Sequence, residues 1–467
     1  MTDFSDRLFV GNVFDTDSYK ASHFLQYPPN TTGMYSHLES RGGRYDSTLF
    51  FGLQYYLKAH LSRPVTSGEV LGAARFFEQH GEPFNLAGWM RVVDKHGGRL
   101  PICIKAVPEG MIIPTHNVLM TVESTDPELF WLSSWVETQL VRLWYPITVA
   151  TQSYQIKRNI FRYLQETADD PVGEIPWKLH DFGSRGVSSR ESAGIGGMAH
   201  LVNFQGSDTC MGVVYANLFY DHQMSGFSIP ASEHSTITMW GKDREEDAYR
   251  NMVEKFAKPG KIFACVSDSY NLFSVLENVW GGALGKEVEK SGATVVVRSD
   301  SGVPVSIVCK TIGILDKKVG TTLNSKGYKV LPKWLRVIQG DGINEDSINE
   351  ILEALKKRGY SASNIAFGMG GALLQKLNRD TQKIAYKCSA AVIDNKEVEV
   401  FKDPVTDPGK RSKAGRLSLI LRDGQFQTVT VVGEDPSDLL KTVFRDGMIY
   451  CNQSLEDVRQ RAGKEFK

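Results

Sequence analysis

Short runs of apolar and β-branched residues recur along residues 175–380, and a turn rich in Gly, Asp and Ser follows each run. Helix-like segments usually come next, which predicts parallel strands joined by crossover helices. The clearest helical spacing lies at 344–358, behind the capping residue Asn344. The expected strands are Trp177–Asp181, Leu201–Phe204, Gly226–Ile229, Ile262–Val266, Thr294–Val297, Leu335–Ile338 and Asn364–Phe367. Seven strands favour an irregular TIM-like α/β barrel, with an open doubly wound sheet as the alternative.

The segments on either side of this region have a different pattern. Residues 99–124 and 392–432 are β-rich, and residues 130–167 are mainly helical. A hairpin is expected at 416–432, turning at Asp423-Gly424. Neither β-rich segment has enough strands to bury a core alone. We therefore expect an accessory β-rich α+β domain built from residues 1–170 and 385–467, and a barrel of residues 171–384.

Composition narrows the class of protein. Of the 467 residues, 41% are hydrophobic and 23% charged, and 54 Lys and Arg balance 54 Asp and Glu. A chain without net charge has a weak overall field, so we expect no nucleic-acid partner and no membrane binding. The six cysteines are scattered without metal-type spacing, and no apolar leader or membrane span is apparent. These features predict a cytoplasmic protein.

The polar turns that follow the expected strands carry the candidate chemistry, because ligands of α/β proteins bind at the carboxyl ends of strands. Gly340-Asp341-Gly342 and Gly368-Met369-Gly370-Gly371 follow two successive strands. Glycine lets an anion approach backbone N–H groups, whereas an ordinary tight turn is the alternative for either loop alone. Two adjacent loops of this kind favour a phosphate site.

His234 stands at the end of an expected strand. It is either a nucleophile or proton carrier, or a hydrogen-bonded structural histidine. Asp268, at the next strand end, is a better partner for the imidazole than Glu233, because adjacent side chains of an extended chain diverge.

Arg298 and Asp300 are a second candidate pair. The guanidinium suits phosphate and the carboxylate suits Mg²⁺ or a ribose hydroxyl, with a local ion pair as the alternative. Phe182, in a turn beside Arg185, is either core or a stacking surface for an aromatic ligand. The dense basic stretch at 402–416 is either a solvated loop or a lid that binds polyphosphate.

These residues lie in segments that resemble the nicotinamide phosphoribosyltransferase family, the type II phosphoribosyltransferases of NAD salvage. The resemblance covers nearly the whole chain. It is carried by Thr16–Lys20, Gln26–Thr31, His180–Gly183, Arg185–Gly186, Ala231–Thr238, Trp240–Asp243, Gln339–Gly342, Leu374–Leu377 and Phe401–Val405.

The resemblance implies transfer of the 5-phosphoribosyl group of phosphoribosyl pyrophosphate to nicotinamide, giving nicotinamide mononucleotide and pyrophosphate. It implies Mg²⁺ bound with the diphosphate, at a protein site that the sequence does not identify. ATP is implied as a co-substrate that phosphorylates His234, with Asp268 as the partner of the histidine. It also implies a homodimer whose sites are shared between subunits.

The resemblance implies a role for each matching residue. Phe182 and Tyr19 hold the pyridine ring, with Tyr19 supplied by the second subunit. Asp208 and Arg298 hold the carboxamide, and Asp300 contacts the ribose. The 5′-phosphate cradle is Gly340, Gly370 and Gly371, and Asp341 is a further substrate-binding candidate. Phosphate and pyrophosphate are handled by Arg185 and, from the second subunit, Arg41, Arg379 and Lys387, with Lys402 and Lys410 at polyphosphate positions.

Two departures from the vertebrate pattern of the family concern the tunnel to the ring pocket: Ser184 replaces Tyr and Ser299 replaces Pro. Two alternative functions remain. Nicotinate phosphoribosyltransferase has a similar barrel, but Asp208 would repel a carboxylate. A non-catalytic ligand-binding or signalling protein on the same fold would have no need of the histidine.

Overall fold

The computed structural model describes residues 11–406, 411–433 and 435–466. The chain divides into two compact units. Unit 1 comprises Met1–Thr151, Leu218–Asp221 and Leu377–Ala462, and unit 2 comprises Gln152–Asn217, His222–Lys376 and Gly463–Lys467. The first change of unit falls inside helix α6 (Trp144–Thr167), whereas the sequence placed it at 170/171. The later change falls at 376/377 rather than at 384/385.

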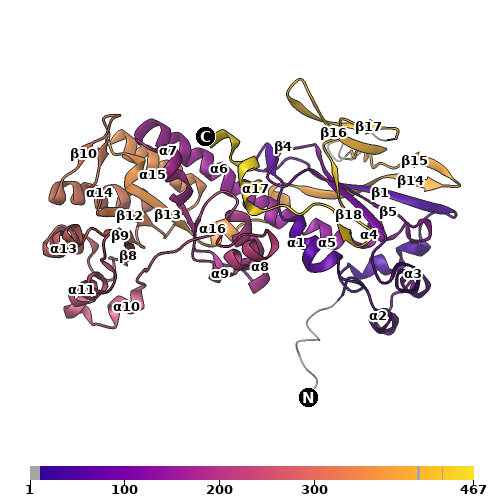
Figure 1. Cartoon of the computed structure of the whole chain (residues 1–467), viewed down its shortest axis with the longest axis horizontal. Helices are drawn as coiled ribbons and strands as arrows, with labels where there is room; N and C mark the ends of the chain where they lie inside the picture. Colours follow the sequence, from indigo (N-terminus) through magenta and orange to yellow (C-terminus); the bar gives the residue numbers. More distant parts are fainter. Residues whose placement is uncertain (1–10, 407–410, 434, 467) are drawn as a thin grey trace, which may run out of the picture. The chain divides into compact units, whose positions relative to one another are not determined.

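A parallel sheet is the centre of unit 2 (Figure 1). Its strands are, in order across the sheet, β7 (Gly206–Ser207), β6 (Leu179–Asp181), β13 (Ile365–Met369), β12 (Leu335–Gln339), β9 (Thr294–Ser299) and β8 (Ile262–Val266). Every neighbouring pair is parallel, so the carboxyl ends of all these strands share one edge. The prediction of a mixed α/β fold with parallel strands is confirmed.

Two of the expected strands are wrong or incomplete. Residues 201–204 form turns after helix α8, and the strand follows at β7. Residues 226–229 form no ladder, and only Phe227 pairs there, by an isolated parallel bridge to Gly206. Ser207 N–H donates to the Phe227 carbonyl at 2.9 Å, and Ala264 N–H donates to the Pro230 carbonyl at 2.9 Å. Segment 227–232 therefore contacts both β7 and β8, the two outer strands of the six-stranded sheet.

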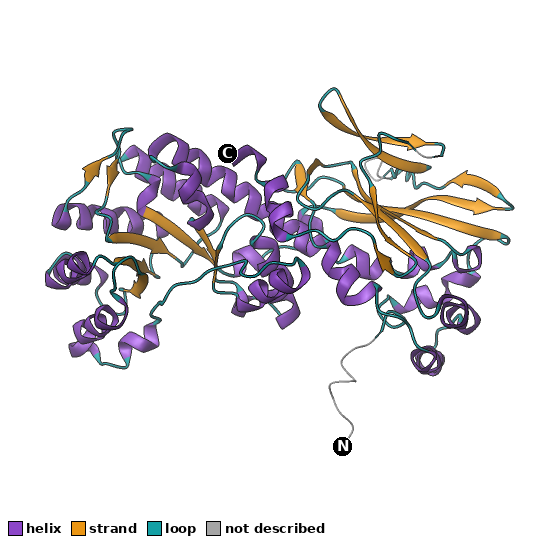
Figure 2. Ribbon diagram, viewed as in Figure 1, coloured by secondary structure: helices purple, strands orange, loops and turns teal. Residues whose placement is uncertain are grey.

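Helices surround these strands (Figure 2). The predicted helix at 344–358 is confirmed as α15, where the Asn344 side chain accepts the N–H groups of Asp346 and Ser347. Such a cap satisfies donors that have no partner within the helix. The α-helices with residues in this unit, besides α6, are α7 (Pro171–Glu174), α8 (Arg190–His200), α9 (Cys210–Phe219), α10 (His234–Thr238), α11 (Glu245–Phe256), α12 (Leu272–Val275), α13 (Ala283–Ser291), α14 (Pro304–Val319), α15 (Glu345–Lys357) and α16 (Gly371–Leu374). Shorter 3₁₀ and π turns in this unit lie at Ile175–Trp177, Ser184–Gly186, Lys242–Arg244, Leu276–Trp280, Ala362–Asn364 and Lys464–Phe466.

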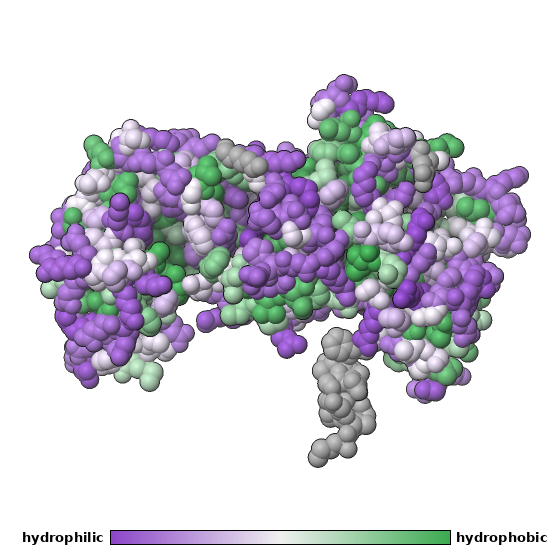
Figure 3. Space-filling view, viewed as in Figure 1, coloured by the Kyte–Doolittle hydropathy of each residue, from purple (hydrophilic) through white to green (hydrophobic). Residues whose placement is uncertain are grey.

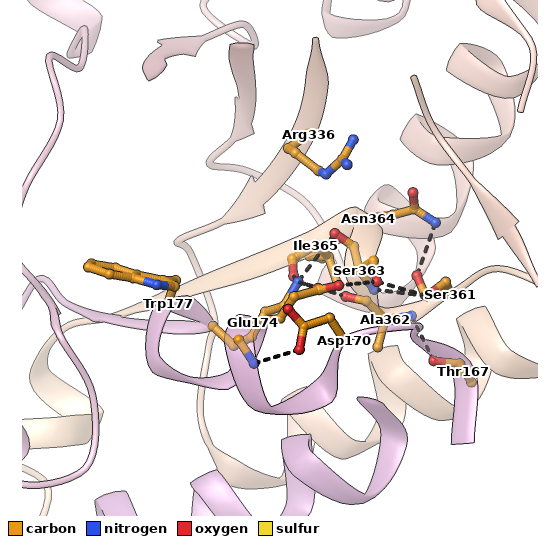
Figure 4. A network of polar contacts seen from close by, with 12 residues as sticks. Thr167, Asp170, Glu174, Trp177, Arg336, Ser361, Ala362, Ser363, Asn364 and Ile365 are labelled. Carbon is orange, nitrogen blue, oxygen red and sulfur yellow. Dashed lines mark hydrogen bonds and ion pairs between the residues drawn. The ribbon is translucent and has the colours of Figure 1, made fainter. Parts of the chain in front are cut away.

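A buried lysine lies directly before β6 and hydrogen-bonds to the chain at the amino-terminal end of this strand. Lys178 Nζ donates to the carbonyls of Ala362, Ser363 and Ile365 at 3.2 Å each, and it pairs with Glu174 at 2.9 Å. Figure 4 labels these four partner residues. Burial lowers the pKa of Lys178 while Glu174 opposes this. Residues at this end of parallel strands usually serve stability rather than chemistry.

Unit 1 is built on an antiparallel sheet. Its strands are, in order across the sheet, β15 (Lys396–Glu399), β14 (Ile384–Ile393), β1 (Thr31–Ser40), β5 (Val118–Ser124), β3 (Ile102–Ala106), β18 (Lys441–Arg445) and β19 (Met448–Ile449). Strands from both ends of the chain therefore share one sheet. The predicted hairpin is confirmed as β16 (Arg416–Arg422) and β17 (Gln425–Val431), and β2 (Ser47–Leu49) pairs with β4 (Ile112–Pro114).

The α-helices with residues in unit 1, besides α6 and the end of α9, are α1 (Leu53–Tyr56), α2 (Ser67–His80), α3 (Leu86–His96), α4 (Leu132–Trp135), α5 (Glu137–Val141) and α17 (Leu455–Ala462). Its 3₁₀ and π turns lie at Ser18–Leu25, Leu57–Leu61, Pro127–Leu129 and Arg379–Thr381. On the face shown in Figure 3, hydrophobic side chains form scattered groups among hydrophilic ones, as is usual for protein surfaces. Within the described ranges, none of the helices is long and apolar enough to span a bilayer.

Candidate active site

A cavity of about 730 Å³ opens at the carboxyl ends of the parallel strands of unit 2. It is lined by Phe182, Ser184, Arg185, Asp208, Glu233, His234, Ser235, Arg298, Asp300, Gly340, Asp341 and Gly370. Nine of these residues are candidates from the sequence. Turns far apart in the chain meet here because parallel strands bring their carboxyl ends to one edge.

Phe182 directly follows β6, and its contacts with strand β13 fix its position. Its N–H donates to the Met369 carbonyl at 3.0 Å, which ties it to the end of β13. A Cβ atom on Gly368 would lie 1.9 Å from Cε2 of Phe182, so only glycine leaves room for the ring there. The Arg298 guanidinium lies 5.6 Å from the centre of the ring. The sequence left core and ligand contact open for Phe182, and the structure places it at the cavity wall.

Arg298 and Asp300 form the local ion pair that the sequence gave as the alternative, and both also line the cavity. Arg298 Nη2 lies 2.8 Å from Asp300 Oδ2, and Nε lies 3.3 Å from Oδ1. A Cβ atom on Gly340 would be 3.0 Å from Asp300 Oδ1, which brings the backbone of this glycine loop close to the pair. A planar guanidinium beside open backbone suits a phosphate or a polar ring substituent.

The imidazole of His234, at the first position of α10, faces the carboxylate of Asp268. His234 Nε2 lies 3.1 Å from Asp268 Oδ1, and the two side chains are 47% and 3% exposed. Asp268 Oδ2 accepts the Asp300 N–H at 2.8 Å and the Ser301 hydroxyl at 2.6 Å. One buried carboxylate therefore holds an accessible imidazole and the turn after β9. Ser301 was not a candidate from the sequence.

Asp208 is held between β6 and the segment that follows α9. Its N–H donates to the Asp181 carbonyl at 2.9 Å, and its side chain accepts a short hydrogen bond from the Ser228 hydroxyl. Ser228 was likewise missed, because a lone serine gives no signal of its position in space. The carboxylate reaches the same cavity as Phe182, so it can accept hydrogen bonds from a substituent on a stacked ring.

The glycine loops lie at adjacent strand ends. Gly340 and Asp341 follow β12, and Gly370 and Gly371 follow β13. A Cβ atom on Gly371 would meet no heavy atom within 4 Å. Ser184 lines the cavity, whereas Ser299, which the sequence related to the tunnel, is fully buried and does not line it.

Asp181 is a fully buried carboxyl beneath the site. Burial raises its pKa to about 6, although the Gly183 N–H, which donates to Oδ1 at 2.7 Å, acts in the other direction. The native state therefore holds the proton more tightly than the unfolded chain, whose carboxyl has a pKa of 3.8. The stability that this proton contributes is complete below pH 3.8 and is lost as the pH rises through 6.

We expect Asp181→Asn to relieve this loss, because the amide keeps an acceptor for Gly183 and carries no charge. Relative to wild type, the variant should gain about 2–3 kcal/mol between pH 4 and pH 7. Urea unfolding of both proteins across that range measures the difference. A difference that does not change with pH would contradict a buried carboxyl with a raised pKa.

The remaining candidates belong to unit 1. Tyr19 is 57% exposed. Burial lowers the pKa of Lys387, and the nearby charges of Arg41, Arg379 and Lys402 lower it further, against Glu137. These four cations therefore form one cluster, whose members come from β14, the end of β1 and the adjacent loops. Lys410 lies outside the described residues.

Comparison with known proteins identifies the fold class of this chain. The nicotinate phosphoribosyltransferase (NAPRTase) family model matches residues 177–448. The solved structure of nicotinate-nucleotide pyrophosphorylase from Pyrococcus furiosus aligns with a TM-score of 0.60 at 16% identity, over 97% of this chain and 95% of that one. Human nicotinic acid phosphoribosyltransferase aligns at 0.56 and 16%, over 96% and 93%. These likenesses establish the fold of the nicotinate phosphoribosyltransferase class.

Relatives in amino-acid sequence identify the family within this fold class. The model of the nicotinamide phosphoribosyltransferase N-terminal domain matches residues 12–104. A nicotinamide phosphoribosyltransferase of Xanthomonas campestris is 54% identical over 96% of this chain and 97% of that protein. One from Mycoplasma pneumoniae is 35% identical over 86% and 94%. The chain belongs to the nicotinamide phosphoribosyltransferase family.

Proposed function

We propose that this enzyme transfers the 5-phosphoribosyl group of phosphoribosyl pyrophosphate to the ring nitrogen of nicotinamide. A bond forms between that nitrogen and the anomeric carbon, while the bond from the anomeric carbon to the pyrophosphate oxygen breaks. The observation that carries the proposal is the single cavity in which an aromatic ring, two arginines, carboxylates and two glycine loops meet in a chain of this family.

The cavity residues divide between the two substrates. Phe182 offers a face for the pyridine ring, and Asp208 accepts from the carboxamide NH₂. Arg185 and the loops at Gly340 and Gly370 receive the phosphate groups, where cations and open N–H groups stabilise the departing charge. The reacting ring nitrogen is neutral, so no group has to remove a proton.

Mg²⁺ is proposed to enter with the diphosphate. The described residues contain no group of three or more His, Cys, Asp or Glu arranged as metal ligands. Asp300 and Asp341, which line the cavity, would be the carboxylates available to hold the metal together with the phosphate oxygens of the substrate. When bound, the metal would neutralise charge on the leaving pyrophosphate.

ATP is proposed to phosphorylate His234: a bond forms between an imidazole nitrogen and the γ-phosphorus, the bond from that phosphorus to the bridging oxygen breaks, and ADP leaves. The imidazole is exposed, and Asp268 orients the ring. The added charge would draw Mg²⁺ and the cationic loops together and couple ATP hydrolysis to the transfer.

The closure of the parallel sheet is a separate part of the proposal. We infer a closed seven-stranded barrel, because segment 227–232 hydrogen-bonds to both outer strands of the parallel sheet.

A shared site in a homodimer is the proposed role of unit 1. The exposed Tyr19 and the cluster of Arg41, Arg379, Lys387 and Lys402 have the chemistry to cover the ring and bind polyphosphate from the second subunit. We propose unit 1 as the accessory domain and unit 2 as the catalytic barrel. A cytoplasmic location fits the six free cysteines.

The direct test is to mix the purified protein with nicotinamide, phosphoribosyl pyrophosphate, Mg²⁺ and ATP and to measure nicotinamide mononucleotide. Nicotinate in place of nicotinamide distinguishes the nicotinate enzyme. Binding of nicotinamide without product would favour a non-catalytic protein.

Asp208→Ser should lower the preference for nicotinamide over nicotinate, because the carboxylate attracts the amide NH₂ and repels a second carboxylate. We expect the ratio of the two kcat/KM values to fall by about 10- to 100-fold. Competition between the two substrates in one reaction measures it directly. An unchanged ratio would refute the role given to Asp208.

A further inference from the structure

Two fully buried side chains link the ends of β9 and β12. Ser299 and Gln339 are the last residues of these strands and are paired in register. The Ser299 hydroxyl donates to Gln339 Oε1 at 2.6 Å. Gln339 Nε2 donates in turn to the Asp341 carbonyl at 3.0 Å. A hydroxyl on one strand is thereby connected through one amide to the backbone of the glycine loop.

This link lies behind the cavity. Side chains alternate between the two faces of a strand, so Ser299 points away from the face that presents its neighbours Arg298 and Asp300. Those two neighbours line the cavity, and Ser299 does not. Gln339 likewise precedes Gly340 and Asp341, which line it. The link therefore cannot touch a ligand in this cavity, but it joins the backbones of two ligand-facing turns.

The glycine loop has few other attachments. Beyond this bond, the Ser347 hydroxyl donates to the Gly342 carbonyl at 3.0 Å. The backbone of Gly340 lies close to the Asp300 carboxylate, because a Cβ atom on Gly340 would be 3.0 Å from Asp300 Oδ1. The distance between the loop and the Arg298–Asp300 pair thus depends on how firmly Gln339 holds the Asp341 peptide.

We propose that Ser299 and Gln339 are positioning residues that hold the Gly340–Asp341 loop against the Arg298–Asp300 pair, and so set the affinity for phosphoribosyl pyrophosphate rather than for the pyridine ring. This inference rests on the proposed function of the cavity. Ser299 orients the amide, because its hydroxyl occupies Oε1 and leaves Nε2 directed at the loop. Without it, a buried carbonyl oxygen loses its donor and the amide is free to turn.

The test compares Ser299→Ala with Ser299→Thr, which keeps a hydroxyl. We expect Ser299→Ala to raise the KM for phosphoribosyl pyrophosphate about 10-fold, because small displacements of a binding group have large effects. Its Kd, measured by calorimetry without nicotinamide, should rise equally. The KM for nicotinamide and the amide preference should stay within about 2-fold. Ser299→Thr should restore most of the affinity.

Gln339→Leu extends the test. It removes the same link from the other side, so combining it with Ser299→Ala should add little to either single change, as expected for residues that act as a unit. The matched control is Ser361→Ala, because Ser361 is also fully buried but lies before β13, at the opposite end of the sheet. This control should lower the melting temperature without moving either KM.

Three results would overturn the inference: equal changes in both KM values, additive effects of the two substitutions, or a Ser299→Ala protein that is less stable but binds phosphoribosyl pyrophosphate normally. Failure of the proposed function would look different, since the wild-type protein itself would then make no nicotinamide mononucleotide.

Discussion

Gly368→Ala should nearly abolish nicotinamide use. The new methyl group, attached to strand β13, would lie 1.9 Å from Cε2 of the Phe182 side chain, a distance that no packing tolerates. The Phe182 ring would have to leave its position at the cavity wall. We expect kcat/KM for nicotinamide to fall by at least about 100-fold, since ring and sugar must meet in a narrow geometry. Steady-state kinetics with nicotinamide as the varied substrate measures the loss.

The control for this change is Gly313→Ala, inside helix α14, where a Cβ atom would meet nothing within 4 Å. That substitution should leave activity unchanged and stabilise the protein by roughly 0.5–1 kcal/mol. Near-normal kinetics of Gly368→Ala in a folded protein would show that Phe182 does not need its present position. Calorimetric binding of phosphoribosyl pyrophosphate to the variant separates a displaced ring from a misfolded chain.

His234→Ala should remove the response to ATP completely. No other group in the proposed mechanism accepts the phosphoryl group, and the neutral methyl cannot do so. We expect incorporation of labelled γ-phosphate to fall by more than about 100-fold and ATP to leave the rate of nicotinamide mononucleotide formation unchanged. Acid lability of the label in the wild-type protein would identify phosphohistidine.

His80→Ala provides the matched control, because His80 is an exposed histidine at the end of α2. It should be labelled and stimulated like wild type. ATP-stimulated turnover by His234→Ala would refute the coupling proposed here while leaving the transfer reaction itself in place.

The alternation of strand and turn predicted the parallel sheet, but the pattern misplaced one strand for a physical reason. Leu201, Val202 and Phe204 are all nearly or fully buried, yet they follow the end of helix α8 without forming a strand. A short apolar run has the same composition in either structure. The strand that does form, β7, has only Gly206 and Ser207 and no hydrophobic pattern at all.

Site residues could be predicted from the sequence where an ionisable side chain follows an expected strand. His234 and Asp268 stand out because ionisable side chains after apolar runs are unusual, and they do meet in the structure. Ser228, Ser301 and Gln339 were not distinguished, since a neutral hydrogen-bonding residue acquires meaning only from the register of its strand and the partner it faces. The resemblance to a known family implied roles for these residues, whereas the hydrogen bonds that join them are seen only in the folded structure.

The crowding of positive groups around Lys387 has a consequence for the resting enzyme. Burial is the largest cause of the lowered pKa of this lysine, and repulsion by Arg41, Arg379 and Lys402 lowers it further, against the attraction of Glu137. A bound polyanion would neutralise these charges and remove their mutual repulsion. That removal would add to the affinity of the cluster for such a ligand. Sulfate or phosphate buffers would then act on this protein as weak surrogate ligands, not as inert salts.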